Sequence, residues 1–220
     1  MVWTKRIYFQ LPESHQYRIT PYWFLGFVEG EGSFFIKTKD LKLTFNIGQA
    51  DIDLALMKEI KDFLKNLPGA EKYGKEKSSL VNFSISQKTK DQHKNFVLIT
   101  ISHKGYVRNV LIPFFNSLTW RSKKQYDFKD WQIIFQLIDK GFHYTEEGLS
   151  CIKLIVSQLN NRRFTVEGNP SVDRTLLEDK IRHLLSGPSN YEKREGGKIW
   201  IISENRYQYN TTPMVVPIYW

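Results

Sequence analysis

The residues with the clearest chemical potential lie in one short apolar stretch near the N-terminus. Gly26 and Gly30 are four positions apart, so on a helix they share one face that a second backbone can approach closely. The carboxylate of Glu31 follows at once, and Gly32 is expected to stop the helix. A close pair of such helices would place two Glu31 carboxylates side by side. Because like charges repel, a divalent cation between them is the expected partner.

The same stretch, residues 24 to 32, reads FLGFVEGEG and resembles the LAGLIDADG signature of homing endonucleases and related intron maturases. The third, sixth, eighth and ninth positions of that signature are filled by Gly26, Glu29, Glu31 and Gly32. The resemblance implies that Glu31 is a metal ligand. It implies a structural role at the helix end for Glu29.

The order of the predicted elements indicates an α+β fold. The expected elements are a helix at 21–30, two strands within 33–49, a helix at 51–67, strands at 79–87 and 95–102, and helices at 105–118, 128–140 and 145–160. Segment 45–49 resembles the family's strand that ends in Gln, and segments 127–131 and 143–149 resemble the later helices of fungal mitochondrial members. They extend the resemblance over residues 20–163. It implies one αββαββα core with a curved, basic, antiparallel four-stranded sheet that binds DNA.

The chain is accordingly divided into three parts. Residues 1–20 form an N-terminal arm, residues 21–163 the endonuclease-like core, and residues 164–220 a C-terminal extension of unknown role. Within the extension, the pattern predicts a helix at 171–185 and a strand or hairpin at 197–209.

One face of the predicted sheet is polar and basic, because lysines, a threonine and amides alternate with apolar residues along the first two strands. Such a face suits DNA, since amides read base edges and lysines meet phosphates or guanines. An ordinary solvated sheet face is the alternative. The candidate DNA-binding residues are Lys37, Lys39, Lys42, Thr44, Asn46, Asn82, Ser84, Ser86, Lys88 and Lys90.

The resemblance implies the rest of a catalytic centre. Glu31 and backbone oxygens near Gly30 would hold Mg²⁺, and other divalent cations could take its place. Gln49 matches a residue that helps to position the attacking water in relatives, although a plain strand-end role is also open. The family places a basic residue after the fourth strand, where either His103 or Lys104 fits.

The sequence contains one signature, because no later apolar helix ends in a Gly-Glu-Gly or a near equivalent. A single core provides one half of a saddle, so a homodimer is expected, with the signature helices at its twofold axis. The expected interface residues are Phe24, Gly26, Phe27 and Gly30. A heterodimer, or half of a larger two-motif system, is the alternative.

Composition points to a polyanionic partner. The formal net charge is +9 and the pI is near 9.4, which favours nucleic acid or an acidic membrane over a purely solubilising charge. The single cysteine, Cys151, excludes an internal disulfide and lies in an apolar helical stretch typical of a buried thiol. No apolar run reaches the length of a membrane span, and the N-terminus has no secretory pattern. We therefore expect an intracellular or organelle-internal protein, and the resemblance favours the mitochondrion.

Together these features predict a site-specific endonuclease that cuts a long pseudo-palindromic target in double-stranded DNA by metal-dependent phosphodiester hydrolysis. The alternative is an intron maturase that uses the same scaffold to bind intron RNA, with little or no cleavage.

Overall fold

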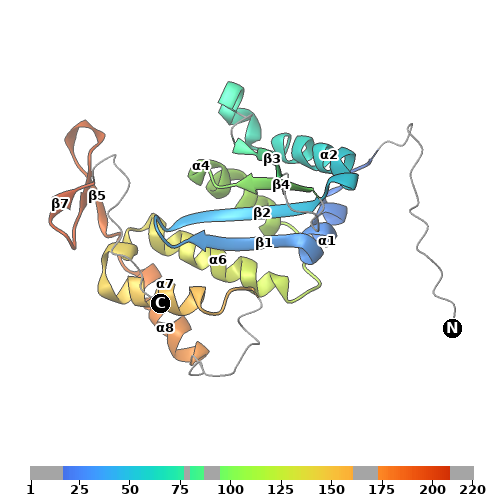
Figure 1. Cartoon of the computed structure of the whole chain (residues 1–220). Coiled ribbons are helices and arrows are strands. Elements are labelled where there is room, and N and C mark those ends of the chain that lie inside the picture. Colours follow the sequence, from blue (N-terminus) through green and yellow to red (C-terminus); the bar gives the residue numbers. More distant parts are fainter. Residues whose placement is uncertain (1–16, 77–79, 87–94, 161–172, 209–220) are drawn as a thin grey trace.

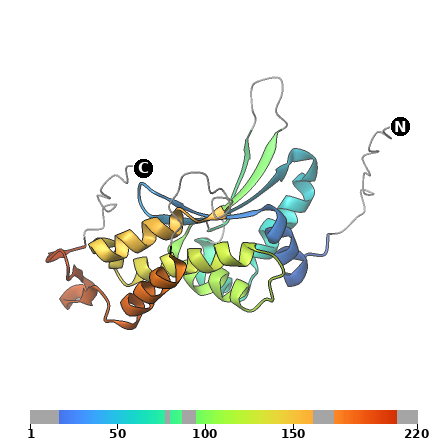
Figure 2. The same ribbon diagram turned by 90° about the horizontal axis from the view of Figure 1, so that it is seen from below.

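The computed structural model describes residues 17–76, 80–86, 95–160 and 173–208. A four-stranded antiparallel sheet lies at its centre, with the strand order β1-β2-β4-β3 (Figure 1). Its strands are β1 (Gly32–Lys37), β2 (Lys42–Ala50), β3 (Asn82–Ser86) and β4 (Phe96–Ile101). Helices gather on one side of this sheet, and the β3–β4 hairpin projects on the other side (Figure 2). The predicted α+β architecture and its αββαββα order are confirmed.

The helices of the core alternate with these strands and then follow them. They are α1 (Pro21–Glu31), α2 (Leu54–Lys65), α4 (Lys104–Tyr106), the π-helix η3 (Val107–Leu111), α5 (Ile112–Asn116), α6 (Lys124–Asp139) and α7 (Glu146–Val156). Short 3-10 turns lie at η1 (Asp51–Asp53), η2 (Ala70–Glu76) and η4 (Phe142–Tyr144). In the part of the chain that the structure describes, no helix has the length and apolarity needed to cross a bilayer.

Helix α1 begins where the sequence places a cap. The Oγ1 atom of Thr20 accepts a hydrogen bond from the Trp23 N–H at 3.3 Å, and Pro21 takes the first helical position, where a missing N–H costs nothing. The buried face of α1 is formed by Phe24, Leu25 and Val28. This face packs on the helix side of the sheet, so the opposite face of α1 remains at the surface.

An aromatic cluster fixes α6 beneath the sheet. Phe34 of β1 contacts Phe128 and Trp131 of α6 with ring centroids 5.5 and 5.4 Å apart. The Trp131 Nε1–H also donates to the Phe35 carbonyl at 3.2 Å. Aromatic pairs of this kind add about 0.5–1.5 kcal/mol each beyond the area that they bury. Helix α6 therefore lies along the sheet from one end of the strands to the other (Figure 1).

The helix predicted over 105–118 contains Pro113, and a π-turn precedes this proline. Residues 107–111 form the π-helix η3, and α5 then starts with Pro113 at one of its first two positions. A proline lacks the N–H that an α-helix interior needs, and a wider turn before it removes that demand. The helix predicted over 105–118 is thus present as three joined segments with a local change of pitch.

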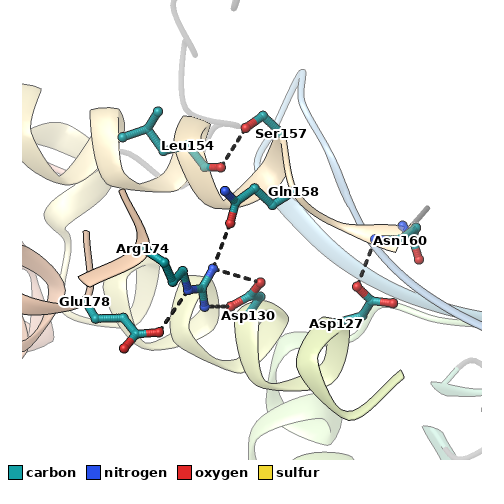
Figure 3. Close-up of polar contacts among 8 residues, drawn as sticks. All are labelled: Asp127, Asp130, Leu154, Ser157, Gln158, Asn160, Arg174 and Glu178. Carbon is teal, nitrogen blue, oxygen red and sulfur yellow. Dashed lines mark hydrogen bonds and ion pairs between the residues drawn. The ribbon is translucent and has the colours of Figure 1, made fainter. Parts of the chain in front are cut away.

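The described part of the C-terminal extension is attached to the core by buried polar contacts. Helix α8 (Arg174–Ser186) begins three residues later than predicted and packs on α6 and α7. The Arg174 guanidinium forms an ion pair with Asp130, which is fully buried on α6, and donates to Gln158 at 3.0 Å (Figure 3). A buried carboxylate needs such a partner, because an uncompensated charge in the interior is costly.

A second, three-stranded sheet follows α8. Its strands are β5 (Tyr191–Lys193), β6 (Ile199–Ile201) and β7 (Arg206–Tyr207), with the turn η6 (Glu195–Gly197) between the first two. The predicted hairpin at 197–209 is present as β6 and β7, and β5 adds to it. The side chain of Asn190, which is buried, donates to the Gly141 carbonyl at 2.8 Å and accepts from the Ser203 N–H at 2.9 Å. These bonds attach the small sheet to the segment that joins α6 and α7.

Candidate functional site

The exposed face of α1 carries aromatic rings and glycines. Trp23 and Phe27 stack one turn apart with ring centroids 5.3 Å apart, and Trp23 is 40% exposed. A Cβ atom added to Gly26 or to Gly30 would meet no atom within 4 Å. Glu31 lies one turn beyond Phe27 and is exposed, so it shares this face. The face therefore offers a flat surface for another backbone, with a carboxylate at its C-terminal end.

Gly32 determines how the chain leaves α1. Its N–H donates to the Val28 carbonyl, and a Cβ at this position would lie 2.7 Å from both the Val28 carbonyl oxygen and the Val28 Cγ1 atom. A residue with a side chain would clash at this position, and glycine therefore allows the chain to turn directly from α1 into β1. The turn holds Glu31 at the start of that strand.

Gln49 lies at the same end of the sheet as Glu31. Gly32 pairs with Ile47, so Gln49 is two residues further along β2 in the direction of α1. Its side chain is half-buried and, by strand alternation, belongs with Phe45 and Ile47 on the helix-covered face. The structure thus places Gln49 near Glu31 at the level of the strands. Its role in positioning water stays a prediction.

Glu29 has a different environment from Glu31, although both lie in the last turn of α1. The Oε1 atom of Glu29 accepts hydrogen bonds from the Arg121 N–H at 2.6 Å and the Ser122 N–H at 2.7 Å. These residues belong to the segment 121–124, here called the basic connector, which contains Arg121, Ser122, Lys123 and Lys124 and leads into α6. The Glu31 carboxylate, in contrast, forms no hydrogen bond or ion pair with any described residue. The end of the sheet with Glu31, Gln49 and the basic connector is called the site end below.

The uncovered face of the sheet has a polar row near the site end. The strand registers place Ser33, Asn46, Thr100 and Asn82 side by side across β1, β2, β4 and β3. Asn46 is half-buried, and its Oδ1 atom is enclosed without a hydrogen bond from the described residues. Asn82 and Ser84 are exposed. Amides and hydroxyls in this arrangement can donate to and accept from a polar ligand laid across the strands.

Comparison with known proteins identifies the family. A sequence profile of the family described as LAGLIDADG endonuclease matches residues 24–135, just over half of the chain. The chain belongs to this family. Its four-stranded sheet and surrounding helices agree with that assignment.

Two curated relatives of the chain come from fungi. The uncharacterized mitochondrial protein RF1 of Saccharomyces cerevisiae is 29% identical over 169 residues, which are 74% of this chain and 35% of that protein. The probable intron-encoded endonuclease 3 of Neurospora crassa is 28% identical over 148 residues, which are 64% of this chain and 24% of that protein. The chain thus spans about a third of the first relative and about a quarter of the second.

Solved structures of LAGLIDADG proteins also match. The homing endonuclease I-GzeII in complex with its DNA target is 27% identical with a TM-score of 0.55, over 69% of this chain and 48% of that one. The meganuclease I-AabMI bound to uncleaved DNA is 30% identical with a TM-score of 0.51, over 64% of this chain and 45% of that one. The matched region is therefore about half of each of these two proteins.

Two of the residues predicted for surfaces are buried instead. Phe24 is fully buried and contacts Phe63, Phe114 and Phe115 of its own chain, so it does not lie on the face proposed for pairing. Thr44 is also fully buried: it stands directly opposite Phe35, and its hydroxyl donates to the Lys42 carbonyl at 3.4 Å. The Thr44 prediction treated strand alternation as exposure, and the Phe24 prediction assigned this residue to the paired face of the signature helix. Both missed the large aromatic neighbours.

The other predicted DNA-binding residues lie in different parts of the chain. The lysines at positions 37, 39 and 42 are exposed at and beside the β1–β2 turn, and the polar row contains Asn46 and Asn82. Ser86 ends β3. Lys88 and Lys90 lie outside the described residues, so those two predictions concern a part of the chain that the structure does not describe.

The predicted basic catalytic residues, His103 and Lys104, lie at the other end of the sheet, here called the far end. Strand β4 runs away from the site end, and His103 is four residues past Ile99, the partner of Ile47, or about 13 Å along the strand. The His103 Nδ1 atom accepts from the Tyr106 N–H at 3.2 Å, and the Lys104 Nζ atom is 3.1 Å from the Asp139 carboxylate. Neither residue therefore lies at the end of the sheet that carries Glu31.

The missed basic residues are those of the basic connector. They are distant from Glu31 in the sequence, and only the Glu29 hydrogen bonds bring them to the site end. The cluster of three basic residues after Trp120 was the available sequence signal. Helix α6 then separates the connector from Asp139 by 16 residues, about 24 Å, so Lys104 and the connector are at opposite ends of the molecule's core.

The far end contains a half-buried, neutral histidine. Burial, with a smaller contribution from the Lys104 charge, lowers the pKa of His143 to about 4. Its ring packs on Tyr144 with centroids 4.1 Å apart and contacts Tyr191 edge to face. Burial also raises the pKa of Tyr144 and of Tyr191. These groups join the core to the small sheet rather than forming a site for catalysis.

A metal ion would have to be shared between copies of the site. Among the described residues, no three His, Cys, Asp or Glu side chains lie close enough together to hold an ion. One chain offers the Glu31 carboxylate and the backbone carbonyls of the last turn of α1, which have no partner within the helix. These oxygens suit a hard divalent cation, but they make up half of a coordination shell.

Proposed function

We propose that this protein is a site-specific endonuclease that hydrolyses both strands of DNA, with Mg²⁺ or a similar divalent cation, as a homodimer. The observation that carries the proposal is the exposed Glu31 carboxylate at the end of the glycine face of α1, beside Gln49 and the basic connector. Membership of the LAGLIDADG endonuclease family supports it. So do the relatives described as an intron-encoded endonuclease and as a homing endonuclease in complex with DNA.

Pairing of two α1 helices completes the site in this proposal. Gly26 and Gly30 let the backbones approach, and Phe27 lies beside them on the same exposed face. The two Glu31 carboxylates then meet at the C-terminal ends of the helices, where a divalent cation offsets their repulsion. The chain aligns with about half of I-GzeII, and this supports an assembly of two copies of the chain. A twofold dimer implies a pseudo-palindromic target.

Each residue at the site end has a role in this reaction. Glu31 and the Gly30 carbonyl would hold the cation, which when bound activates water and neutralises charge on the phosphate. Gln49 would orient the attacking water through its amide. A cation of the basic connector would stabilise the negative charge that develops on the phosphate.

The uncovered face of the sheet is proposed to read the DNA. In this proposal the Asn46 and Asn82 amides, which lie in the polar row, contact base edges. Lys37, Lys39 and Lys42 extend the face toward phosphates. Since phosphate contacts release counterions, affinity should fall steeply with salt. The mitochondrial relative RF1 favours the mitochondrion as the compartment.

The test is incubation of the protein with DNA that spans the intron-free form of the gene hosting its reading frame, with Mg²⁺ and separately with a chelator. Double-strand cleavage in Mg²⁺ alone is the expected result. Tight binding of the intron RNA without cleavage of this DNA would reject the nuclease in favour of an RNA maturase.

A further inference from the structure

The two acids at the end of α1 are both in an unfavourable position for the helix itself. Negative charges near a helix C-terminus oppose the helix dipole, and the last turn of α1 contains no basic residue to offset them. Glu31 is explained by the proposed metal site. Glu29 needs a different explanation, because side chains two positions apart on a helix point in different directions.

The contact of Glu29 supplies that explanation. One oxygen of its carboxylate accepts from two successive backbone N–H groups, those of Arg121 and Ser122, at 2.6 and 2.7 Å. These donors lie just before α6, where a negative charge is favourable because the N-terminus of a helix is electropositive. Hydrogen bonds to an ionised acceptor are about twice as strong as neutral ones. The carboxylate is thus a strong tie between α1 and the start of α6.

The tied segment is short, and its other contacts orient it. Before it, the buried Trp120 ring stacks on Phe128 with centroids 5.2 Å apart, and its Nε1–H donates to the Phe115 carbonyl at 3.2 Å. After it, the Ser122 Oγ atom accepts from the Lys124 N–H at 3.3 Å. Between Trp120 and Lys124, Glu29 holds the backbone directly to the helix that carries Glu31. The side chains of Arg121 and Lys123 are exposed.

We propose that Glu29 is a positioning residue. By binding the backbone of the basic connector, it holds the basic side chains of that connector at a fixed place beside Glu31. This inference rests on the proposed function, because the cations are positioned for the phosphate that Glu31 addresses. Glu29 itself neither binds metal nor touches the phosphate. Helix α1 therefore carries two carboxylates with different roles. Glu31 binds the metal, and Glu29 positions the cations of the basic connector.

The experiment compares Glu29→Ala and Glu29→Gln with the wild type in single-turnover cleavage and in DNA affinity. We expect Glu29→Ala to cleave on the order of 10²-fold more slowly, because a misplaced catalytic group costs about that much, while DNA affinity stays within about threefold. Glu29→Gln keeps an oxygen that accepts from both N–H groups, so it should recover most of the rate. A loss of affinity as large as the loss of rate would overturn the proposal.

A double-mutant cycle tests whether Glu29 acts through the connector. In a variant with Arg121, Lys123 and Lys124 all changed to Ala, the additional change Glu29→Ala should alter the rate by less than about twofold, because residues that act through one another are not additive. The same additional loss in both backgrounds would overturn the proposal. Thermal melting of each variant checks that the fold is retained.

Amide exchange provides a readout that needs no activity. Exchange of the Arg121 and Ser122 amides should accelerate about tenfold or more in Glu29→Ala and little in Glu29→Gln, as expected when a hydrogen bond that protects an amide is lost. Unchanged exchange would overturn the proposal. If the wild type cleaves and Glu29→Ala cleaves equally fast, the positioning role alone fails. If the wild type does not cleave, the proposed function fails and the positioning role falls with it.

Discussion

At the site end of the sheet, the Glu31 carboxylate is exposed and engages no described residue, while Glu29 nearby is tied to the basic connector. At the far end, Lys104 and Arg108 both pair with Asp139, and the His143 ring packs against Tyr144 and Tyr191. Both ends thus contain acids, bases and aromatic rings. At the far end the charged groups pair with one another, whereas at the site end a charge and an apolar face are left for a partner.

This difference distinguishes charged groups that stabilise the fold from charged groups that are available for binding or catalysis. Ionisable groups that neutralise each other within the chain hold elements together, here the C-terminus of α6, helix α4 and the small sheet. Groups at the site end cost the isolated chain some stability, because Glu31 lies against the dipole of α1. Such a cost is expected where a residue is kept for binding or catalysis.

The largest expected effect compares an acid at the site end with a base at the far end. Glu31→Gln should slow single-turnover DNA cleavage about 10³-fold or more, since loss of a metal ligand removes several kcal/mol of transition-state stabilisation. DNA affinity should change little. Lys104→Met, as the matched control, should cleave within about twofold of the wild type, because Lys104 pairs with Asp139 away from the site. An equal loss in both variants would erase the distinction between the two ends.

The next effect concerns the glycine face of α1. Gly26→Leu should reduce the dimer affinity about 10²-fold or more, because a side chain would stand where a second backbone must approach, while a single chain has open space there. Mass measurement by light scattering checks this. Glu59→Leu adds the same side chain to an exposed position of α2 and should leave a dimer. A wild-type mass of one chain at micromolar concentration would contradict the pairing of α1 helices.

A smaller effect is expected for the attachment of α8. Arg174→Met should lower the free energy of unfolding by about 3 kcal/mol, because the fully buried Asp130 carboxylate loses its guanidinium. Arg182→Met on the same helix is the control: it breaks an exposed pair with Asp179 at 2.7 Å and should change stability by less than about 0.5 kcal/mol. Urea unfolding measures both. Equal losses in the free energy of unfolding for the two variants would mean that α8 is held by its apolar face alone.

The smallest effect is a pH dependence from the far end. The pKa of His143 is about 4 in the folded protein and near 6.5 in the unfolded chain, so the unfolded state binds the extra proton between these values. Stability from this group is therefore present above pH 6.5 and is lost as pH falls toward 4. Urea unfolding should show a loss of about 2 kcal/mol from pH 7 to pH 5 in the wild type. His143→Gln should remove that part of the dependence, and an unchanged slope would contradict a lowered pKa of His143 in the folded protein.

The sequence by itself determined the local features of this protein. Alternation along β1 and β2, the cap at Thr20 and Pro21, and the glycines of α1 each depend on residues within a few positions of one another. These patterns were sufficient for the αββαββα order and for Glu31 at the end of α1. Cys151 was correctly expected to be buried, since its helix has an apolar face.

Only the tertiary structure decided which distant groups meet. Lys104 follows β4 directly, yet the direction of that strand takes it to the far end. The basic connector is 92 residues from Glu29 in the sequence but bonded to it in space. Phe24 and Thr44 were expected at surfaces and are buried, because aromatic neighbours from other segments or the opposite strand enclose them. Strand direction and packing set these contacts, and neither is encoded in any short window of the chain.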